Sequence, residues 1–181
     1  MPKVESQRPA PKSPYAVAKL AAEGYCQVFN ESFGVETVVL RYFNVYGPRQ
    51  DPSSPYSGVI SIFVDKISQG QAPTIFGAGQ QTRDFVYVGD VAQANLLAGD
   101  VSEAAGRILN IGRAQQISIN HLFEQLNSLL HTNLEAIRAP ARNGDIEHSC
   151  ADASLANQVL GWRANVPLEE GLRQLLVATL N

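Results

Sequence analysis

The chain has 181 residues, of which 45% are hydrophobic and 17% are charged, a composition typical of a globular protein with a hydrophobic core. The formal net charge of −3 offers no basic surface for nucleic acid or an anionic membrane, so neither is expected as a partner. No apolar run approaches the roughly 18 residues of a membrane span, and the polar residues 1–12 lack the apolar core of a signal peptide, so we expect a cytoplasmic protein.

The cysteines and histidines are few and far apart. Most of the chain separates Cys26 from Cys150, which favours free thiols over a disulfide in a reducing compartment. His121, His131 and His148 have none of the spacings of zinc motifs. The sequence therefore predicts no metal site.

The first 57 residues predict an extended leading segment, a helix, a buried strand and a loop. Ser13 and Pro14 favour a helix start, because serine caps a helix and proline fits its first turn, and Gly34 favours the helix end. Residues 35–43 are rich in β-branched and aromatic side chains, as in a buried strand. Residues 44–57 contain three prolines and predict a long loop, of a length that often carries function.

From residue 58 onward, helices and short strands are predicted to alternate, with a glycine turn at residues 77–79. The predicted helices cover residues 58–69, a segment from Asp90 as cap to Leu97, a segment opened by Ser118, a segment from Asp152 as cap to Gly161, and residues 168–180. The predicted strands cover residues 74–76, 84–88, 108–111 and 134–138. This alternation indicates an α/β or α+β protein.

Tyr15 and Lys19 are the most informative pair for chemistry. Four residues apart on the predicted helix, they share one face. A phenol alone is a poor base at neutral pH, but a nearby ammonium stabilises the phenolate, so the pair suits acid–base catalysis at a sugar hydroxyl. A packed tyrosine beside a solvated lysine is the alternative, and the pair by itself does not decide between them.

Further motifs follow this pair in a fixed order. They are SPYAVAK (13–19), LRYFNVYGP (40–48), GAGQQTRDFVYV (77–88), NIG (110–112), RNGDI (142–146), AD (151–152) and LGW (160–162). In order and spacing the set resembles the extended short-chain dehydrogenase/reductase family. Within that family it resembles the NAD-dependent nucleotide-sugar epimerases and dehydratases, above all the UDP-N-acetylglucosamine (UDP-glucose) 4-epimerases.

The resemblance implies a role for individual residues. In that family the tyrosine removes the proton of the sugar 4-hydroxyl while hydride moves to NAD, and the lysine binds the nicotinamide ribose, so Tyr15 and Lys19 would be both catalytic and cofactor-binding. Phe43 matches the residue that borders the nicotinamide. Arg83 and Arg142 match two arginines that grip the substrate diphosphate, which suits the guanidinium fork.

The other implied positions belong to the substrate pocket. They are Asn44 near the diphosphate, Asp145 near the nucleoside ribose, Ser149 near the sugar 2-substituent, and Gly58, Val59, Thr74 and Phe76 around the uracil. Val59 and Phe76 fit the hydrophobic core equally well, and Asn44 fits a turn before Gly47.

Two features of the family are missing from the sequence. There is no glycine-rich strand–turn–helix for the NAD pyrophosphate, since Gly77-Ala78-Gly79 precedes a predicted strand, and there is no upstream Ser or Thr to complete the Tyr–Lys triad. We therefore expect an α/β, truncated Rossmann-like fold that lacks most of the N-terminal parallel sheet. Residues 1–57 would be a remnant of the NAD-binding domain. Residues 58–181 would be the substrate-binding domain, with some strands and helices returning to the Rossmann part.

The expected function is that of a UDP-sugar 4-epimerase-like protein, NAD-dependent in the complete fold, that binds no NAD and is inactive alone. A non-catalytic nucleotide-sugar-binding or oligomerisation module, a remnant without a function of its own, and a fragment of a nucleotide-sugar 4,6-dehydratase are the alternatives. The strand at residues 35–43 and the helix of Tyr15 would lack neighbours. A homo-oligomer, such as the family's dimer, or a missing N-terminal half is therefore the expected partner.

Overall fold

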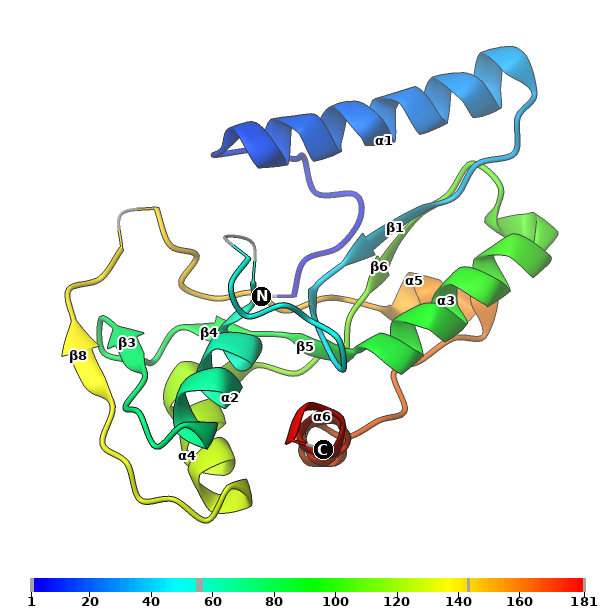
Figure 1. Cartoon of the computed structure of the whole chain (residues 1–181). Coiled ribbons are helices and arrows are strands. Elements are labelled where there is room, and N and C mark those ends of the chain that lie inside the picture. Colours follow the sequence, from blue (N-terminus) through cyan, green and yellow to red (C-terminus); the bar gives the residue numbers. More distant parts are fainter. Residues whose placement is uncertain (1, 55–56, 143, 181) are drawn as a thin grey trace.

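The structure is a computed structural model that describes residues 2–54, 57–142 and 144–180. Helices and short strands alternate along these ranges (Figure 1). The elements are α1 (Pro14–Phe33), β1 (Val39–Tyr42), β2 (Asn44–Tyr46), α2 (Val59–Ser68), β3 (Thr74–Phe76), β4 (Thr82–Arg83), β5 (Phe85–Tyr87), α3 (Val88–Asp100), η1 (Ser102–Ala104), β6 (Ile108–Ile111), β7 (Ile117–Ser118), α4 (Ile119–Leu129), β8 (Ile137–Ala139), α5 (Ser154–Leu160) and α6 (Leu168–Leu180).

Within the described ranges the strands pair two by two. β1 with β6, β2 with β5, and β3 with β8 are parallel, whereas β4 with β7 is antiparallel. Parallel partners require long crossover connections, which explains why helices intervene between them along the chain. β1 pairs with β6 on one side, and no described strand pairs with its other edge.

Two hydrophobic clusters form the core. The first joins α2, α4 and α6 with β3 and β5, and the second joins α3, α5 and β6 around Trp162. β5 contributes Phe85 to the first cluster and Val86 to the second, because successive side chains of a strand point to opposite faces. The two clusters therefore lie on either side of β5, as the separate groups of helices in Figure 1 illustrate.

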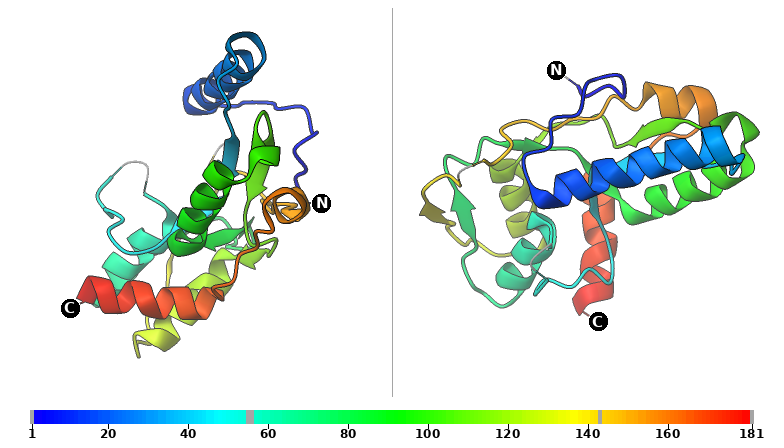
Figure 2. Two further views of the ribbon diagram at one scale, coloured as in Figure 1. Left: turned by 90° about the vertical axis from the view of Figure 1, so that its right-hand side faces the viewer. Right: turned by 90° about the horizontal axis from the view of Figure 1, so that it is seen from above.

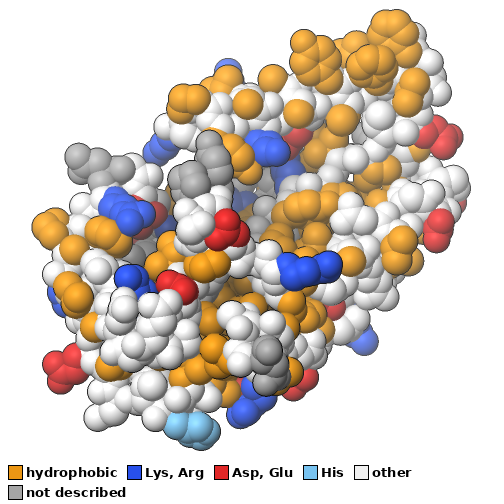
Figure 3. All heavy atoms as spheres, viewed as in Figure 1, with side chains coloured by type: hydrophobic (Ala, Val, Ile, Leu, Met, Phe, Trp, Pro, Cys, Tyr) orange, Lys and Arg blue, Asp and Glu red, His pale blue; other side chains and the backbone are white. Residues whose placement is uncertain are grey.

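α1 stands apart from both clusters. The Ser13 hydroxyl accepts a hydrogen bond from Ala16 N at its start (3.2 Å), and Gly34 ends it with φ 66°, so both predicted ends are confirmed. None of its residues is buried, and Figures 1 and 2 show it crossing one edge of the molecule. Figure 3 shows hydrophobic atoms gathered along this edge. The large exposed side chains of α1 are Tyr15, Val17, Tyr25, Val28, Phe29 and Phe33.

Some predicted elements differ from the structure. β1 begins only at Val39, so the strand predicted for residues 35–43 is too long. Residues 44–46 form β2 rather than the start of a loop, because β5 provides a parallel partner that lies about 40 residues further along the chain. β4, β7 and η1 have no clear signal in the sequence pattern.

Asp90 and Asp152 were predicted to cap helices, and neither does. Tyr87 is the N-cap of α3, and Asp90 lies buried in its first turn, where the carboxylate accepts from Val166 N (3.1 Å). Ala153 is the N-cap of α5, and Asp152, one residue earlier, accepts from Ser154 N (3.0 Å). The remaining predicted helices and strands lie where expected, with ends shifted by a few residues.

Both cysteines are free, as predicted, with Cys150 buried and Cys26 partly exposed. The described residues contain no group of three or more His, Cys, Asp and Glu side chains that would hold a metal ion. Although α1 has 20 residues, no helix in the described ranges combines the length and hydrophobicity needed to cross a bilayer.

Candidate functional site

A cavity of about 940 Å³ lies between the leading segment, α1, the strands β1 and β6, and the segment 144–148. Four residues predicted from the sequence line it, namely Tyr15 and Lys19 of α1, Phe43 after β1, and Asp145. These residues come from three parts of the chain that are far apart in sequence. The fold thus brings together the predicted catalytic pair, the predicted neighbour of the nicotinamide and one predicted substrate residue.

Tyr15 and Lys19 lie one above the other on α1, as their spacing predicts. The Lys19 ammonium nitrogen is 5.4 Å from the centre of the Tyr15 ring. At this distance the positive charge is attracted by the ring face. Tyr15 is 60% exposed and lines the cavity.

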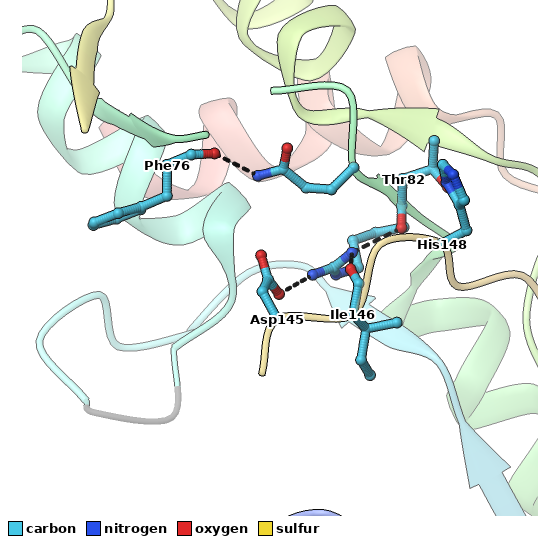
Figure 4. A network of polar contacts seen from close by, with 7 residues as sticks. Phe76, Thr82, Asp145, Ile146 and His148 are labelled. Carbon is cyan, nitrogen blue, oxygen red and sulfur yellow. Dashed lines mark hydrogen bonds and ion pairs between the residues drawn. The ribbon is translucent and has the colours of Figure 1, made fainter. Parts of the chain in front are cut away.

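Arg83 holds the segment that carries Asp145. Its Nη2 lies 2.5 Å from Asp145 Oδ1, and its Nη1 donates to the carbonyls of Ile146 (2.6 Å) and Thr82 (2.9 Å). Figure 4 shows the labelled Asp145 and Ile146 beside this network. The Arg83 side chain is only 15% exposed and that of Asp145 is 37% exposed. Since the charge of Arg83 is largely removed from water, the contact with a carboxylate matters more than in a surface pair.

Backbone hydrogen bonds also join β4 to the segment that carries Asp145. Thr82 N donates to the Glu147 carbonyl (2.9 Å), and Ser149 N donates to the Thr82 carbonyl (3.1 Å). His148 also lines the cavity, and its Nδ1 lies 3.0 Å from Thr82 Oγ1. No motif around His148 in the sequence indicated that it would line this cavity. β4 and the segment 144–149 are therefore held side by side by main-chain and side-chain bonds.

Arg142 and Phe76 form a second contact outside the cavity. The guanidinium carbon of Arg142 lies 3.7 Å from the centre of the Phe76 ring, a stacking distance. Gln81 donates to the Phe76 carbonyl (2.9 Å), which fixes the end of β3. The planar group of Arg142 is thereby held close to β3.

The other predicted residues lie in the elements around these contacts and do not line the cavity as the described residues define it. Asn44 begins β2 and its N donates to the Asp84 carbonyl (2.9 Å). Gly58 is the N-cap of α2, Val59 is the first residue of that helix and packs against the first cluster, and Thr74 begins β3. Ser149 lies beside β4. Of the predicted residues, Tyr15, Lys19, Phe43 and Asp145 thus line the cavity, and Arg83 contacts Asp145.

Asp84 is a central residue that the sequence pattern did not indicate. It is fully buried, and its carboxylate accepts from Arg113 N (2.8 Å), Ala114 N (3.0 Å) and Ala151 N (2.8 Å). Burial raises the pKa of Asp84, and the backbone N–H groups oppose this rise. The side chain joins β4 and β5 to the turn after β6 and to the chain that follows segment 144–149. A polar residue directly before an apolar strand was the available signal.

The residues present fit one end of an NAD molecule. Tyr15, Lys19 and Phe43 surround one cavity, as the family's nicotinamide end requires. The turn at residues 77–79 does not fit the pyrophosphate, since it leads into β4 rather than a helix. A Cβ on Gly79 would lie 2.1 Å from Asn120 Oδ1, so the turn is already packed against α4.

Comparison with known proteins places the chain in a family. Residues 2–112 match the NAD dependent epimerase/dehydratase family. The chain belongs to this family. A UDP-glucose 4-epimerase of Mycolicibacterium smegmatis is 36% identical over 162 residues, which are 90% of this chain and 51% of that protein. The chain spans about half the length of the curated relatives it matches.

Solved structures of family members match the fold closely. A Thermotoga maritima UDP-glucose 4-epimerase with UDP-glucose has a TM-score of 0.94 and 40% identity, covering 99% of this chain and 58% of that one. A Methanobrevibacter ruminantium UDP-N-acetylglucosamine 4-epimerase in complex with UDP-N-acetylmuramic acid has a TM-score of 0.94 and 39% identity, covering 99% and 57%. The predicted resemblance and the predicted Rossmann-like α/β fold are confirmed. The coverage agrees with the C-terminal half of an extended short-chain dehydrogenase/reductase.

Proposed function

We propose that this chain forms the substrate side of a UDP-sugar 4-epimerase. The observation that carries the proposal is the shared cavity of Tyr15, Lys19, Phe43 and Asp145, with Arg83 bound to Asp145. The similarity to structures that contain UDP-glucose or another UDP-sugar supports this substrate class. Tyr15 would exchange a proton with the sugar 4-hydroxyl at its phenol oxygen, and Lys19 would stabilise the phenolate and bind a ribose hydroxyl.

The diphosphate would bind at Arg83 and Arg142. Arg83 already holds carboxylate and carbonyl oxygens with both terminal nitrogens, so phosphate oxygens can take the same positions. Arg142, stacked on Phe76, keeps the N–H groups at its edge available for hydrogen bonds. The remaining proposed substrate residues are Asn44, Gly58, Val59, Thr74, Phe76, Asp145 and Ser149.

NAD, when bound, would supply the hydride acceptor. The chain's own residues would hold only the nicotinamide end, at Tyr15, Lys19 and Phe43, so we propose that turnover requires a further NAD-binding unit. We also propose that residues 1–57 form the cofactor side and residues 58–181 the substrate side, from which some strands and helices return to the cofactor side. In support, the second cluster packs Val38, Leu40 and Val45 against helices and a strand from later in the chain.

We propose a homodimer through α1. With about 100° between successive helix residues, Val17, Val28, Tyr25 and Phe29 lie within about 60° of the direction opposite Glu23. Glu23 faces the body of the molecule, so these side chains face away from it. A helix face of this kind suits pairing with the same face of a second copy.

Size-exclusion chromatography with light scattering tests the dimer. Phe29→Glu should give a monomer at micromolar concentration because it places a charge in the interface. Leu96→Glu, at an exposed apolar side chain of α3, is the matched control and should leave the dimer intact. A well-folded wild-type monomer at the same concentration would argue against the interface.

Calorimetry tests the substrate class. UDP-glucose and UDP-N-acetylglucosamine should bind with one site per chain, and NAD should give no measurable heat with this chain alone. Arg83→Ala should weaken UDP-sugar binding about tenfold or more, the value of one or more charged hydrogen bonds. Arg173→Ala, at an exposed ion pair on α6, should change nothing. Absence of UDP-sugar binding would contradict the proposal, whereas binding without interconversion after addition of NAD supports a binding module.

A further inference from the structure

The attachment of α1 depends on polar groups. Neither hydrophobic cluster includes a side chain of this helix. The Thr37 hydroxyl donates to the Cys26 carbonyl (2.7 Å). The Arg41 guanidinium of β1 binds Glu23 of α1 at two points, with Nε–Oε1 2.8 Å and Nη2–Oε2 2.7 Å. These directional bonds therefore contribute to the orientation of the helix.

The contact between Glu23 and Arg41 is partly shielded from water. The exposed fractions of the two side chains are 17% for Glu23 and 23% for Arg41. Its hydrogen bonds with Glu23 raise the pKa of Arg41. Unlike an exposed pair, which contributes little, a shielded pair leaves an uncompensated charge when one partner is removed.

Arg41 also connects to the leading segment and to β6. Its Nη1 donates to the Glu5 carbonyl (3.3 Å), and Asn110, its register partner in β6, donates from its backbone N to Glu5 Oε1 (2.8 Å). Asn110 Nδ2 donates to the Lys3 carbonyl (2.8 Å). Arg41 is thus held by the leading segment, which also binds β6, in addition to its contact with α1.

Tyr15, Lys19 and Glu23 share one line on α1. Steps of four residues turn a helix by only about 40°, so the three side chains lie within about 80° of one another. All three, and Arg41, line the same cavity. Fixing the direction of Glu23 therefore fixes the direction of the other two.

We propose that Glu23 and Arg41 form a positioning pair, whose two-point contact sets the rotation of α1 and so aims Tyr15 and Lys19 into the cavity. Neither residue touches the reacting atoms; both act through the helix. The role of the pair in catalysis rests on the proposed function, whereas its effect on the orientation of α1 is independent of that function.

Hydrogen–deuterium exchange, resolved to individual peptides, tests whether the pair attaches α1 to the rest of the chain. Arg41→Ala should speed exchange of α1 amides about tenfold to hundredfold, because an isolated helix of this length is marginal in water, and should leave α4 amides unchanged. Arg41→Lys should lie between wild type and Arg41→Ala, since one ammonium cannot form the fork. The charge-swapped variant E23R/R41E should recover most of the lost protection. Arg173→Ala, which breaks an ion pair within α6, is the control and should leave α1 unchanged.

Thiol labelling reports on α1 independently. Burial raises the pKa of the Cys150 thiol, so labelling at neutral pH reports mainly on Cys26, which lies on α1. Labelling should be faster in Arg41→Ala and should slow again in the swapped variant. Unchanged α1 exchange and labelling in Arg41→Ala would overturn the proposal. So would equal acceleration in α1 and α4, which indicates global destabilisation.

Ligand binding separates positioning from attachment. Arg41→Ala should weaken UDP-glucose binding several-fold and leave UDP binding unchanged, because only the sugar reaches Tyr15 and Lys19. Equal effects on the two ligands would overturn the positioning role. If neither ligand binds the wild type, the proposed function fails, and the exchange and labelling results still decide whether the pair orients α1.

Discussion

Replacing Asp84 by Asn tests the main polar contact of the interior. The carboxylate accepts three backbone N–H groups with its two oxygens, whereas an amide retains one accepting oxygen. One or two of these donors then face an NH2 group in a site that excludes water. Each unsatisfied donor costs about 1–3 kcal/mol, so we expect a loss of about 1–6 kcal/mol in the free energy of unfolding. That is a large part of the roughly 5–15 kcal/mol that stabilises a typical protein.

Urea unfolding followed by tryptophan fluorescence measures this loss. Trp162 is the single tryptophan, is 1% exposed and lies in the second cluster, so its signal reports on the folded core. Asp51→Asn, in an exposed loop, is the matched control and should leave the unfolding midpoint unchanged. An Asp84→Asn protein within about 0.5 kcal/mol of wild type, the range of neutral surface changes, would show that the three N–H groups do not depend on the carboxylate.

The pH dependence gives a second test of Asp84. Its pKa is raised above the ordinary value of 3.8, so the folded state binds its proton more tightly than the unfolded state. This contribution to stability is complete below pH 3.8 and is lost as the pH rises through the raised pKa. The stability gap between wild type and Asp84→Asn should therefore narrow with rising pH over this window. A gap that widens would indicate a lowered pKa instead.

Three further variants test other parts of the structure. Arg83→Ala should release segment 144–149 and speed trypsin cleavage after Arg142 about tenfold to hundredfold, with Arg173→Ala as control, and an unchanged rate would contradict the role of Arg83. Leu172→Ala should cost about 2–5 kcal/mol in urea unfolding, since Leu172 is fully buried in the first cluster, and a loss below 1 kcal/mol would argue against that packing. Hydrogen bonds from Ser154 lower the pKa of Asp152, so the contribution of Asp152 to folding stability is present above pH 3.8 and is lost as the pH falls through the lowered pKa. Asp152→Ala should therefore flatten the acid side of the curve of stability against pH. An unchanged curve would contradict this.

Local chemistry was enough to predict α1 and α4. Ser13 and Gly34 define the ends of α1 through capping and a left-handed backbone, and Ser118 starts α4 by accepting from His121 N (3.1 Å). Each of these signals lies within a few residues of the structure that it determines. Helix ends of this kind are therefore readable from sequence.

Contacts between residues far apart in the chain could not be predicted from the sequence in the same way. β2 exists because residues 44–46 pair with β5, and Asp90 does not cap α3 but is buried and accepts a hydrogen bond from Val166 N. Asp84 joins three segments that only the folded chain brings together. The resemblance implied separate substrate roles for Arg83 and Asp145 but not their contact, because 62 residues separate the two side chains.

Binding of a UDP-sugar in this cavity can be tested by a titration with UDP-glucose followed by amide NMR. We expect shifts in two groups of amides, those around Arg83 and segment 144–149, and those around Tyr15 and Lys19, because the proposed ligand spans both. Arg83→Ala should weaken both sets of shifts together. Absence of shifts at millimolar UDP-glucose, or shifts confined to α6 and the far side of α4, would contradict the proposal that this cavity binds a UDP-sugar.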